Sequence, residues 1–139
     1  GVTGFGAGCA GAYGNVPVLG CRQSPALGNA NFAFELHGAA PQRATGAMLG
    51  VQGHTPGIDL APFGVPGCAL HLDPLITLFG TTSAGDASRG EGTATFPLPV
   101  PADPNLLGAT LYCQAFVDDP GSGRPAALTL TNALRVTVR

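Results

Sequence analysis

Three histidines are the side chains of this chain best suited to proton transfer or metal binding near neutral pH. His37 and His71 each fall on the less apolar face of a predicted strand, and Asp73 follows His71 by two residues, so these two side chains should share one face. Such a pair could bind a metal ion or shuttle protons. A solvated face with a weak hydrogen bond explains the same pattern more simply, and we favour it. His54 lies in the segment GHTPG, which is typical of an ordinary loop.

Adjacent carboxylates at Asp118 and Asp119 precede the flexible segment PGSG. A calcium ion takes six to eight oxygen ligands, and loops of this kind can supply several of them. The regular D-x-D-x-D-G spacing is missing, so we favour an Asx-type turn over a calcium site. Asp86 and Glu91 flank Arg89 in a second polar loop, where solubility is the simplest role. We therefore predict no bound metal ion and no cofactor.

Catalytic motifs are missing from the chain. None of the serines, at positions 24, 83, 88 and 122, lies in a GxSxG motif. Two carboxylates could still converge as in a glycosidase. With no Trp and only two Tyr, however, the chain has few aromatic rings on which a sugar could stack. A formal GxGxxG at Gly6, Gly8 and Gly11 lacks the preceding strand and following helix of a dinucleotide site. We predict no catalytic residues and expect that the protein is not an enzyme.

Four cysteines, at positions 9, 21, 68 and 113, show neither CxxC nor zinc-finger spacing with histidine, which favours disulfides over metal binding. Of three possible connectivities we expect Cys9–Cys21 with Cys68–Cys113. The first bond would close a local Gly-rich loop, and the second would join the segment CALHL to a strand facing the core. The chain begins at Gly1 without Met or a signal peptide, so we expect a mature protein that is secreted to the extracellular space or cell surface.

Length and charge limit the classes of partner. A chain of 139 residues forms one domain. Only 10% of its residues are charged, six Arg and no Lys supply the positive charge, and the net charge is -2. Nucleic acid and anionic membranes both require clustered positive charge, so neither is an expected partner. No run of 18 apolar residues occurs, which argues against membrane insertion.

The clearest structural signal is a β-hairpin between Leu111 and Val138. Two alternating runs, 111–117 and 128–138, flank the turn-forming segment Asp118 to Pro125. In the second run the even-numbered residues are mostly aliphatic, whereas the odd-numbered set contains three Thr, one Ala and one Arg. We therefore expect one buried and one solvated face. Asn132, the polar residue of the inward set, marks either a bulge or a buried amide with partners.

The rest of the chain divides into further short strands and turns. Gly46 and Gly50 interrupt one strand and indicate a bulge or a close approach of another backbone, and Pro17 indicates a sheet edge. The segment 80–92 is a polar loop, and 1–15 forms a Gly-rich N-terminal arm. The expected fold is all-β: an antiparallel, jelly-roll-like β-sandwich of eight or nine short strands with almost no helix. Its strands before the hairpin are expected at 16–19, 31–37, 44–51, 58–60, 68–72, 75–79 and 93–98.

Four segments carry a resemblance to a known group of domains: PALGNANFAFELHGAAP, PGCALHLDP, PVPADPNLLGATLYCQAFVDDPG and LTNALRVTV. Together they resemble a functionally uncharacterised family of short β-domains in exported proteins of environmental bacteria. The resemblance implies an extracellular accessory module with no assigned catalytic residues. Cys113 stands where a small residue is common in that family.

The N-terminal arm and the sheet edges suggest a function. Since a Gly-rich arm cannot order itself, either Cys9–Cys21 or a neighbouring subunit must hold it. No Lys protects the sheet edges, and the low charge does little to oppose self-association. We therefore expect a non-enzymatic, self-assembling structural protein, a filament or surface-layer subunit whose main partner is itself. The alternative is a monomeric adhesion module that binds a surface protein or a cell-surface glycan through a concave patch formed by Phe5, Tyr13, Phe63 and Tyr112.

Overall fold

Short antiparallel strands form the framework of the molecule. The computed structural model describes residues 1–85 and 89–139 and contains ten strands there, with helix limited to three single 3-10 turns. The strands are β1 (Val2–Phe5), β2 (Val18–Arg22), β3 (Ala33–Ala39), β4 (Ala44–Gly50), β5 (Gly53–Asp59), β6 (Ala69–Leu72), β7 (Ile76–Thr81), β8 (Gly92–Pro97), β9 (Thr110–Asp118) and β10 (Leu128–Thr137). The 3-10 turns are η1 (Ala61–Phe63), η2 (Pro104–Leu106) and η3 (Pro120–Ser122). None of the helices in the described residues has the length and hydropathy that crossing a bilayer requires.

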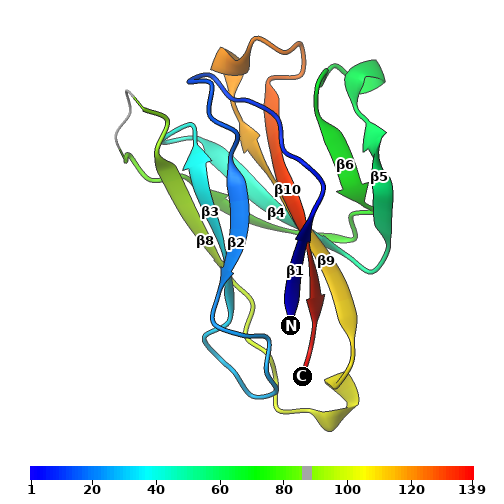
Figure 1. Cartoon of the computed structure of the whole chain (residues 1–139). Coiled ribbons are helices and arrows are strands. Elements are labelled where there is room, and N and C mark those ends of the chain that lie inside the picture. Colours follow the sequence, from blue (N-terminus) through cyan, green and yellow to red (C-terminus); the bar gives the residue numbers. More distant parts are fainter. Residues whose placement is uncertain (86–88) are drawn as a thin grey trace.

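The strands form three antiparallel sheets (Figure 1). The largest has five strands in the order β1-β10-β9-β4-β7, the second has three in the order β2-β3-β8, and β5 pairs with β6 alone. The predicted all-β, antiparallel sandwich is therefore confirmed. The predicted hairpin is β9–β10, and the edge strand indicated by Pro17 is β2.

The main core lies between the five-stranded and three-stranded sheets. Phe34 and Leu36 of β3 are fully buried, and the Phe34 ring meets that of Phe32 edge to face with centroids 5.3 Å apart. From the large sheet, Ala47 and Leu49 of β4 face the same interior. Burying each large apolar side chain stabilises the fold by roughly 1.5–3 kcal/mol, which is the main force that holds the two sheets together.

Part of the outer face of the large sheet is also covered. The β5–β6 hairpin and the N-terminal arm pack on it and bury Cys9, Val65, Cys68 and Leu130 in a second apolar cluster. The expectation of a solvated face on β10 is therefore wrong up to Ala133, although Arg135 is exposed as expected. Thr129, Thr131 and Ala133 were assigned to that face, yet all three are buried.

A β-bulge in β10 explains why the predicted faces of this strand differ from the observed ones. The pairing of β10 with β9 shifts by one residue between Leu130 and Ala133. Because the side chains of a strand alternate, such a shift moves the residues beyond it to the other face. Leu130 therefore belongs to the outer cluster, whereas Leu134 and Val136 belong to the main core.

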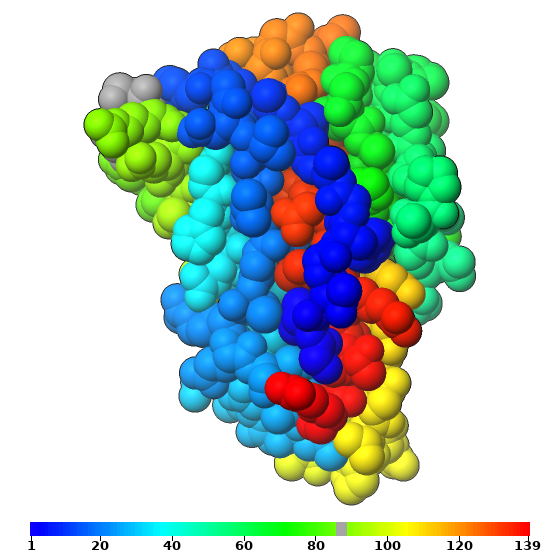
Figure 2. Space-filling model, viewed as in Figure 1, coloured from blue at the N-terminus to red at the C-terminus, as the bar shows by residue number. Residues whose placement is uncertain are grey.

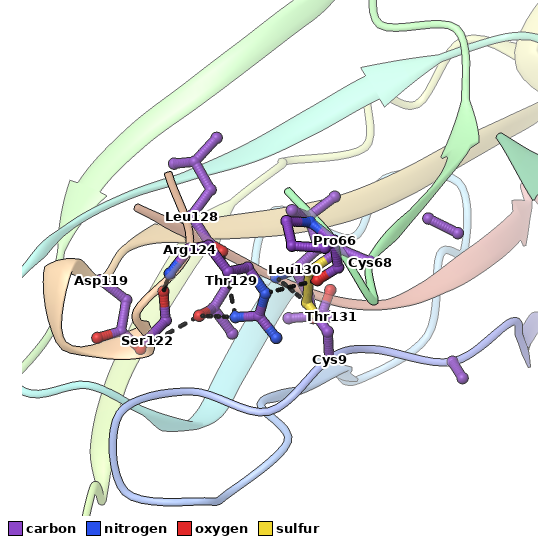
Figure 3. The surroundings of a disulfide bond; sticks show 12 residues. Cys9, Pro66, Cys68, Asp119, Ser122, Arg124, Leu128, Thr129, Leu130 and Thr131 are labelled. Carbon is purple, nitrogen blue, oxygen red and sulfur yellow. Dashed lines mark hydrogen bonds between the residues drawn. A yellow bond between two sulfur atoms is a disulfide. The ribbon is translucent and has the colours of Figure 1, made fainter. Parts of the chain in front are cut away.

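The disulfide pairing also differs from the prediction. Cys9 bonds to Cys68, with Cα atoms 5.2 Å apart, while Cys21 and Cys113 are free. Figure 3 shows the bond between the N-terminal arm and the segment that precedes β6, directly over β10. The Leu130 N–H donates to the Cys9 sulfur over 3.2 Å. The predicted pairing fails because Cys113 faces the main core whereas Cys68 lies on the opposite face of the large sheet.

The N-terminal arm packs against the rest of the same chain. Its first residues form β1, which pairs with β10 from Val2↔Val136 to Phe5↔Ala133. Figure 2 shows this dark blue segment lying along the red and orange C-terminal strand. Beyond β1 the arm passes so close to β10 that a Cβ on Gly8 would lie 2.7 Å from the Leu130 carbonyl oxygen. The arm is thus held by sheet pairing and by Cys9–Cys68 rather than by Cys9–Cys21.

Two glycines in β4 mark close approaches, as predicted. A Cβ on Gly46 would lie 2.6 Å from the Phe116 ring, and one on Gly50 would lie 2.1 Å from the Asp73 carbonyl oxygen. Glycine at these positions lets β4 pass beneath the outer-face residues without displacing them.

Candidate interaction edge

One edge of the large sheet is open at β7. This strand pairs with β4 through six consecutive residue pairs, from Ala44↔Thr81 to Leu49↔Ile76, without a bulge. Among the strands that the structure describes, no other pairs with it. The backbone groups on its far side are therefore available to a further strand.

The sequence of this edge explains why it forms a strand. Residues 75–81 read LITLFGT, a β-branched and aromatic run without charge or Pro. Ile76 and Leu78 are opposite Leu49 and Ala47 on the inner face, so Thr77 and Phe79 lie on the outer face. The edge is consequently apolar on both faces.

Large apolar side chains on this edge are exposed to solvent. Leu75 is 69% exposed, Ile76 is 61% exposed and Phe79 is 78% exposed. Nearby, the exposed side chain of Val51 borders the same inner surface. Scattered apolar residues are normal on a protein surface, but a contiguous apolar edge indicates a binding site.

The hydrogen-bond pattern identifies which backbone groups point outward. The Thr82 N–H points towards β4 and donates to the Arg43 carbonyl directly opposite, whereas the next N–H, that of Ser83, points to Thr93 of β8. Hydrogen-bonded and non-hydrogen-bonded pairs alternate along an antiparallel ladder. Thr77 and Phe79 therefore direct their N–H and C=O groups away from β4.

The open part of the edge has a defined end. Just beyond β7, the Ser83 N–H donates to the Thr93 carbonyl of β8 over 2.8 Å, which joins the two larger sheets at that corner. At the other end, the Leu75 N–H donates to the Leu49 carbonyl of β4 over 2.8 Å. The available edge thus extends over Ile76 to Phe79.

An apolar groove lies on each face of this edge. The inner groove, between the two larger sheets, is lined by Leu49, Gly50, Val51, Leu75, Ile76, Leu98 and Leu111. The outer groove, between the large sheet and the β5–β6 hairpin, includes Met48, Phe63 and Phe116. Phe79 extends the outer surface, since its ring meets that of Phe116 edge to face at 6.5 Å. A strand added to β7 would place alternate side chains beside each groove.

The other described edges carry features that discourage pairing. β2 has the ion pair Arg22–Glu35, 2.8 Å long, and β1 has only four residues. β8 contains Pro97, β5 contains Pro56, and β6 has only four residues. Charge, Pro and short length are the usual means by which edge strands avoid unwanted pairing. Among the described edges, β7 therefore stands out as long, uncharged and free of Pro.

His71 and Asp73 do not share the solvated face that we expected, nor do they form a pair. His71 is buried, and its Nε2 lies 3.3 Å from the Ala7 carbonyl oxygen, while its Nδ1 has no hydrogen-bond partner among the described residues. Asp73 lies beyond the end of β6, where the alternation of the strand no longer applies. Its Oδ1 is instead 2.6 Å from Nε2 of His54. The assignment of His54 to a loop is also wrong, because this residue lies in β5.

His37 is exposed, and its Nε2 lies 3.3 Å from Glu35 Oε2. Glu35 also accepts a hydrogen bond from Arg22 over 2.8 Å. The Arg22 hydrogen bond, supported by the charges of Arg22 and His37, lowers the pKa of the Glu35 carboxyl from its ordinary value of 4.5. This group is an exposed ion-pair cluster on the three-stranded sheet.

The adjacent carboxylates of Asp118 and Asp119 accept hydrogen bonds from other groups of the protein. Asp118 accepts a hydrogen bond from Arg43 over 3.0 Å. Asp119 is buried and accepts from the Ala12 N–H and the Thr129 hydroxyl, so it fastens the arm to β10. The Asp119 side chain does not cap η3, which argues against the predicted Asx-type turn.

Metal-ligand clusters of three or more His, Cys, Asp or Glu side chains are not found in residues 1–85 and 89–139. In the second polar loop, Asp86 and Ser88 lie outside the described residues. The Arg89 carbonyl there accepts a hydrogen bond from Asn15 of the arm.

The free thiols are poor candidates for a nucleophile. Burial raises the pKa of the Cys113 thiol well above its ordinary value. Burial, and secondarily the Glu35 charge, also raises the pKa of the Cys21 thiol. A reactive cysteine requires a lowered pKa, because the thiolate is the nucleophile.

The four aromatic residues expected to form a patch occupy three different places. Phe5 and Tyr112 meet edge to face, with centroids 6.0 Å apart. Tyr13 lines a shallow depression that also contains Arg43 and Asp119. Phe63 lines the outer groove beside β7.

Residues 75–79 are recognisable from sequence as a strand but not as an interaction edge. The available signal was that its residues are apolar on both faces and uncharged. That signal is ambiguous, because central strands buried on both faces have the same composition. Only the position of β7 in the sheet distinguishes these two cases.

Comparison with known proteins returned no match: no protein-family model, curated protein or solved structure is significantly similar to this chain. The resemblance to secreted bacterial β-domains therefore stays a prediction.

Proposed function

We propose that this protein is a non-enzymatic, extracellular structural protein that associates with copies of itself through the open β7 edge. The single observation that carries the proposal is the combination of unpaired backbone groups and exposed apolar side chains over Ile76 to Phe79. A segment of this composition on an exposed edge associates readily with other strands. Pairing would satisfy its backbone groups and cover Ile76 and Phe79 together.

Electrostatics does little to oppose such association. The net charge is -2 over 139 residues, and residues 74–83 contain no charged side chain. The extracellular location is supported by the disulfide Cys9–Cys68, since such bonds persist in oxidising compartments. A filament or surface-layer subunit would require a second contact in addition to the one at β7.

The test is the native mass in solution, measured by light scattering over a range of protein concentrations. We expect a multiple of the 13.8 kDa chain mass that returns to a single chain in the variants Ile76→Lys and Phe79→Lys. Both side chains are mostly exposed, so the fold should tolerate the change. Val18→Lys is the matched control, since Val18 is also an exposed residue on an edge strand.

Two results would refute the proposal. One is a single-chain mass for the native protein at every concentration. The other is an assembly that both lysine variants leave intact. Deleting residues 1–15 would be a poor test, because it removes β1 and half of the disulfide and thus disrupts the domain itself.

A second candidate function is binding of a glycan in the depression at Tyr13. The exposed Tyr13 ring lies there beside Arg43 and Pro120, and an exposed aromatic ring with a polar neighbour is suited to a sugar. Tyr13→Ala should then abolish binding on a glycan array while leaving the native mass unchanged. Equal glycan binding by the variant, or none by the native protein, would exclude this function.

A further inference from the structure

The open edge has a sequence that is suited to pairing with itself. Residues 75–79 read Leu-Ile-Thr-Leu-Phe, with a polar residue at the centre and two large apolar residues on each side. If two such strands run antiparallel with Thr77 opposite Thr77, then Ile76 is opposite Leu78 and Leu75 is opposite Phe79. Every apolar side chain is then paired with an apolar side chain. Thr–Thr and apolar cross-strand pairs are both favourable.

The hydrogen-bond pattern of β7 is compatible with this register at its centre, whereas the Leu75 N–H at its end is already bonded to the Leu49 carbonyl. Hydrogen-bonded pairs across a new interface require residues whose backbone groups point away from β4, and Thr77 is one of them. Two copies of Thr77 can thus exchange both backbone hydrogen bonds at the centre of the interface. The inner faces of the two sheets then lie on the same side, so the two inner grooves become neighbours.

Two neighbouring registers are less favourable. A shift of two residues in one direction would place the second copy's Leu75 opposite Thr81, near the corner where Ser83 bonds to Thr93 of β8. A shift of two in the other direction would place Asp73 opposite the exposed ring of Phe79. The Thr77-centred register avoids both contacts.

Charge also favours a second copy as the occupant. In this register Asp73 falls opposite the neutral Thr81, so no like charges face each other within the paired stretch. The grooves on both faces require a strand that is apolar on both faces, and β7 has that property. By contrast, the other edge strand of the large sheet, β1, is already fixed beside β10 by the disulfide-bonded arm.

We infer that two copies of this chain pair through β7, antiparallel and with Thr77 at the two-fold axis, so that their large sheets become continuous. This inference rests on the proposed function and specifies the partner and the register. A two-fold contact uses the same surface on both copies and therefore closes at a pair. The expected native mass is that of a dimer.

Disulfide cross-linking of Thr77→Cys in a Cys21→Ser background tests the register. Removing Cys21 leaves only the buried Cys113 as an unpaired native thiol. Cα atoms in a hydrogen-bonded antiparallel pair lie about 5.5 Å apart, within the range that a disulfide can bridge. Mild oxidation should therefore produce a covalent dimer on a non-reducing gel.

Thr81→Cys in the same background is the matched control. Thr81 is on the same strand and the same face as Thr77. In the Thr77-centred register its two copies are eight residues apart along the strand direction, which is roughly 26 Å and far beyond the reach of a disulfide. This variant should stay uncross-linked under the same oxidation.

Different results would refute the Thr77-centred register and the proposed self-association. A native dimer whose Thr77→Cys variant does not cross-link, or whose Thr81→Cys variant cross-links equally well, would refute the register while leaving self-association intact. A native protein that has the mass of a single chain at all concentrations would refute the proposed function and the inference together.

Discussion

The Asn132 side chain makes two hydrogen bonds to the backbone of Leu19. Its Oδ1 accepts from the Leu19 N–H over 2.9 Å, and its Nδ2 donates to the Leu19 carbonyl over 3.1 Å. A side-chain amide offers the same donor and acceptor as a peptide group, so Asn132 takes the place of a neighbouring strand for β2. It stands in the bulge of β10 and thereby joins the large sheet to the three-stranded sheet.

Replacing Asn132 with Asp should destabilise the protein by about 1–3 kcal/mol. The carboxylate has nearly the same shape but no N–H, so the Leu19 carbonyl loses its donor and faces a negative charge. Urea denaturation gives the free energy of unfolding. Asn105→Asp, in an exposed turn, is the control and should change little. Equal effects of the two substitutions would contradict the role of Asn132.

Replacing Gln114 with Leu should loosen the β5–β6 hairpin. The fully buried Gln114 amide accepts from the His71 N–H and donates to the carbonyls of Ala69 and Thr131. Leu fills a similar volume but leaves these backbone groups unpaired, at a cost of about 3 kcal/mol or more. Hydrogen exchange should become faster first in β5 and β6.

The matched control for that experiment is Gln52→Leu, whose side chain is exposed. It should leave both the exchange rates and the free energy of unfolding nearly unchanged. If Gln114→Leu leaves exchange in β6 as slow as in the native protein, the amide does not hold the hairpin.

Removing the disulfide with Cys9→Ser and Cys68→Ser together should cost about 4 kcal/mol, according to the chain-entropy estimate for a bond that spans 59 residues. The free energy of unfolding, measured in denaturant, is the readout. Cys21→Ser should change it little, because Cys21 is not bonded. Peptide mapping without reduction should yield Cys9 linked to Cys68, and a peptide that links Cys9 to Cys21 would overturn the assignment.

The Glu35 ion pair should make a small contribution to stability that disappears in acid. The pKa of Glu35 is lower in the folded protein than its ordinary value of 4.5. The contribution is therefore complete above that value and is lost as the pH falls through the lower, folded-state pKa. Because the pair is largely solvated, its size should stay below about 1 kcal/mol.

Glu35→Gln should accordingly be less stable than the native protein at pH 7, and the difference should shrink at pH 3. In an Arg22→Gln background the same substitution should have a smaller effect at pH 7, because the strongest interaction is missing and only His37 remains beside Glu35. Thermal unfolding at the two pH values measures both differences. A difference that grows in acid would contradict the assigned direction of the pKa shift.

Much of the secondary structure follows from local pattern. Alternation predicted the β9–β10 hairpin, and Gly46 and Gly50 predicted the close approach of other residues to β4. These features depend on residues near in sequence, on strand geometry and on the space that a Cβ requires. Asn132 was likewise singled out as a bulge or a partnered amide, and it proves to be both.

Features that depend on distant parts of the chain were decided only by the tertiary structure. One extra residue in β10 moves Leu130 and Leu134 to opposite faces, although both have the same parity in the sequence. Cys9 meets Cys68 only because the arm and the β5–β6 hairpin cover the same outer face of the large sheet. The uncharged run 75–79 lies at an edge rather than in the centre because sheet order depends on how strands far apart in the sequence pair. Local composition determines that a strand forms, whereas its neighbours determine which of its surfaces remain free to bind.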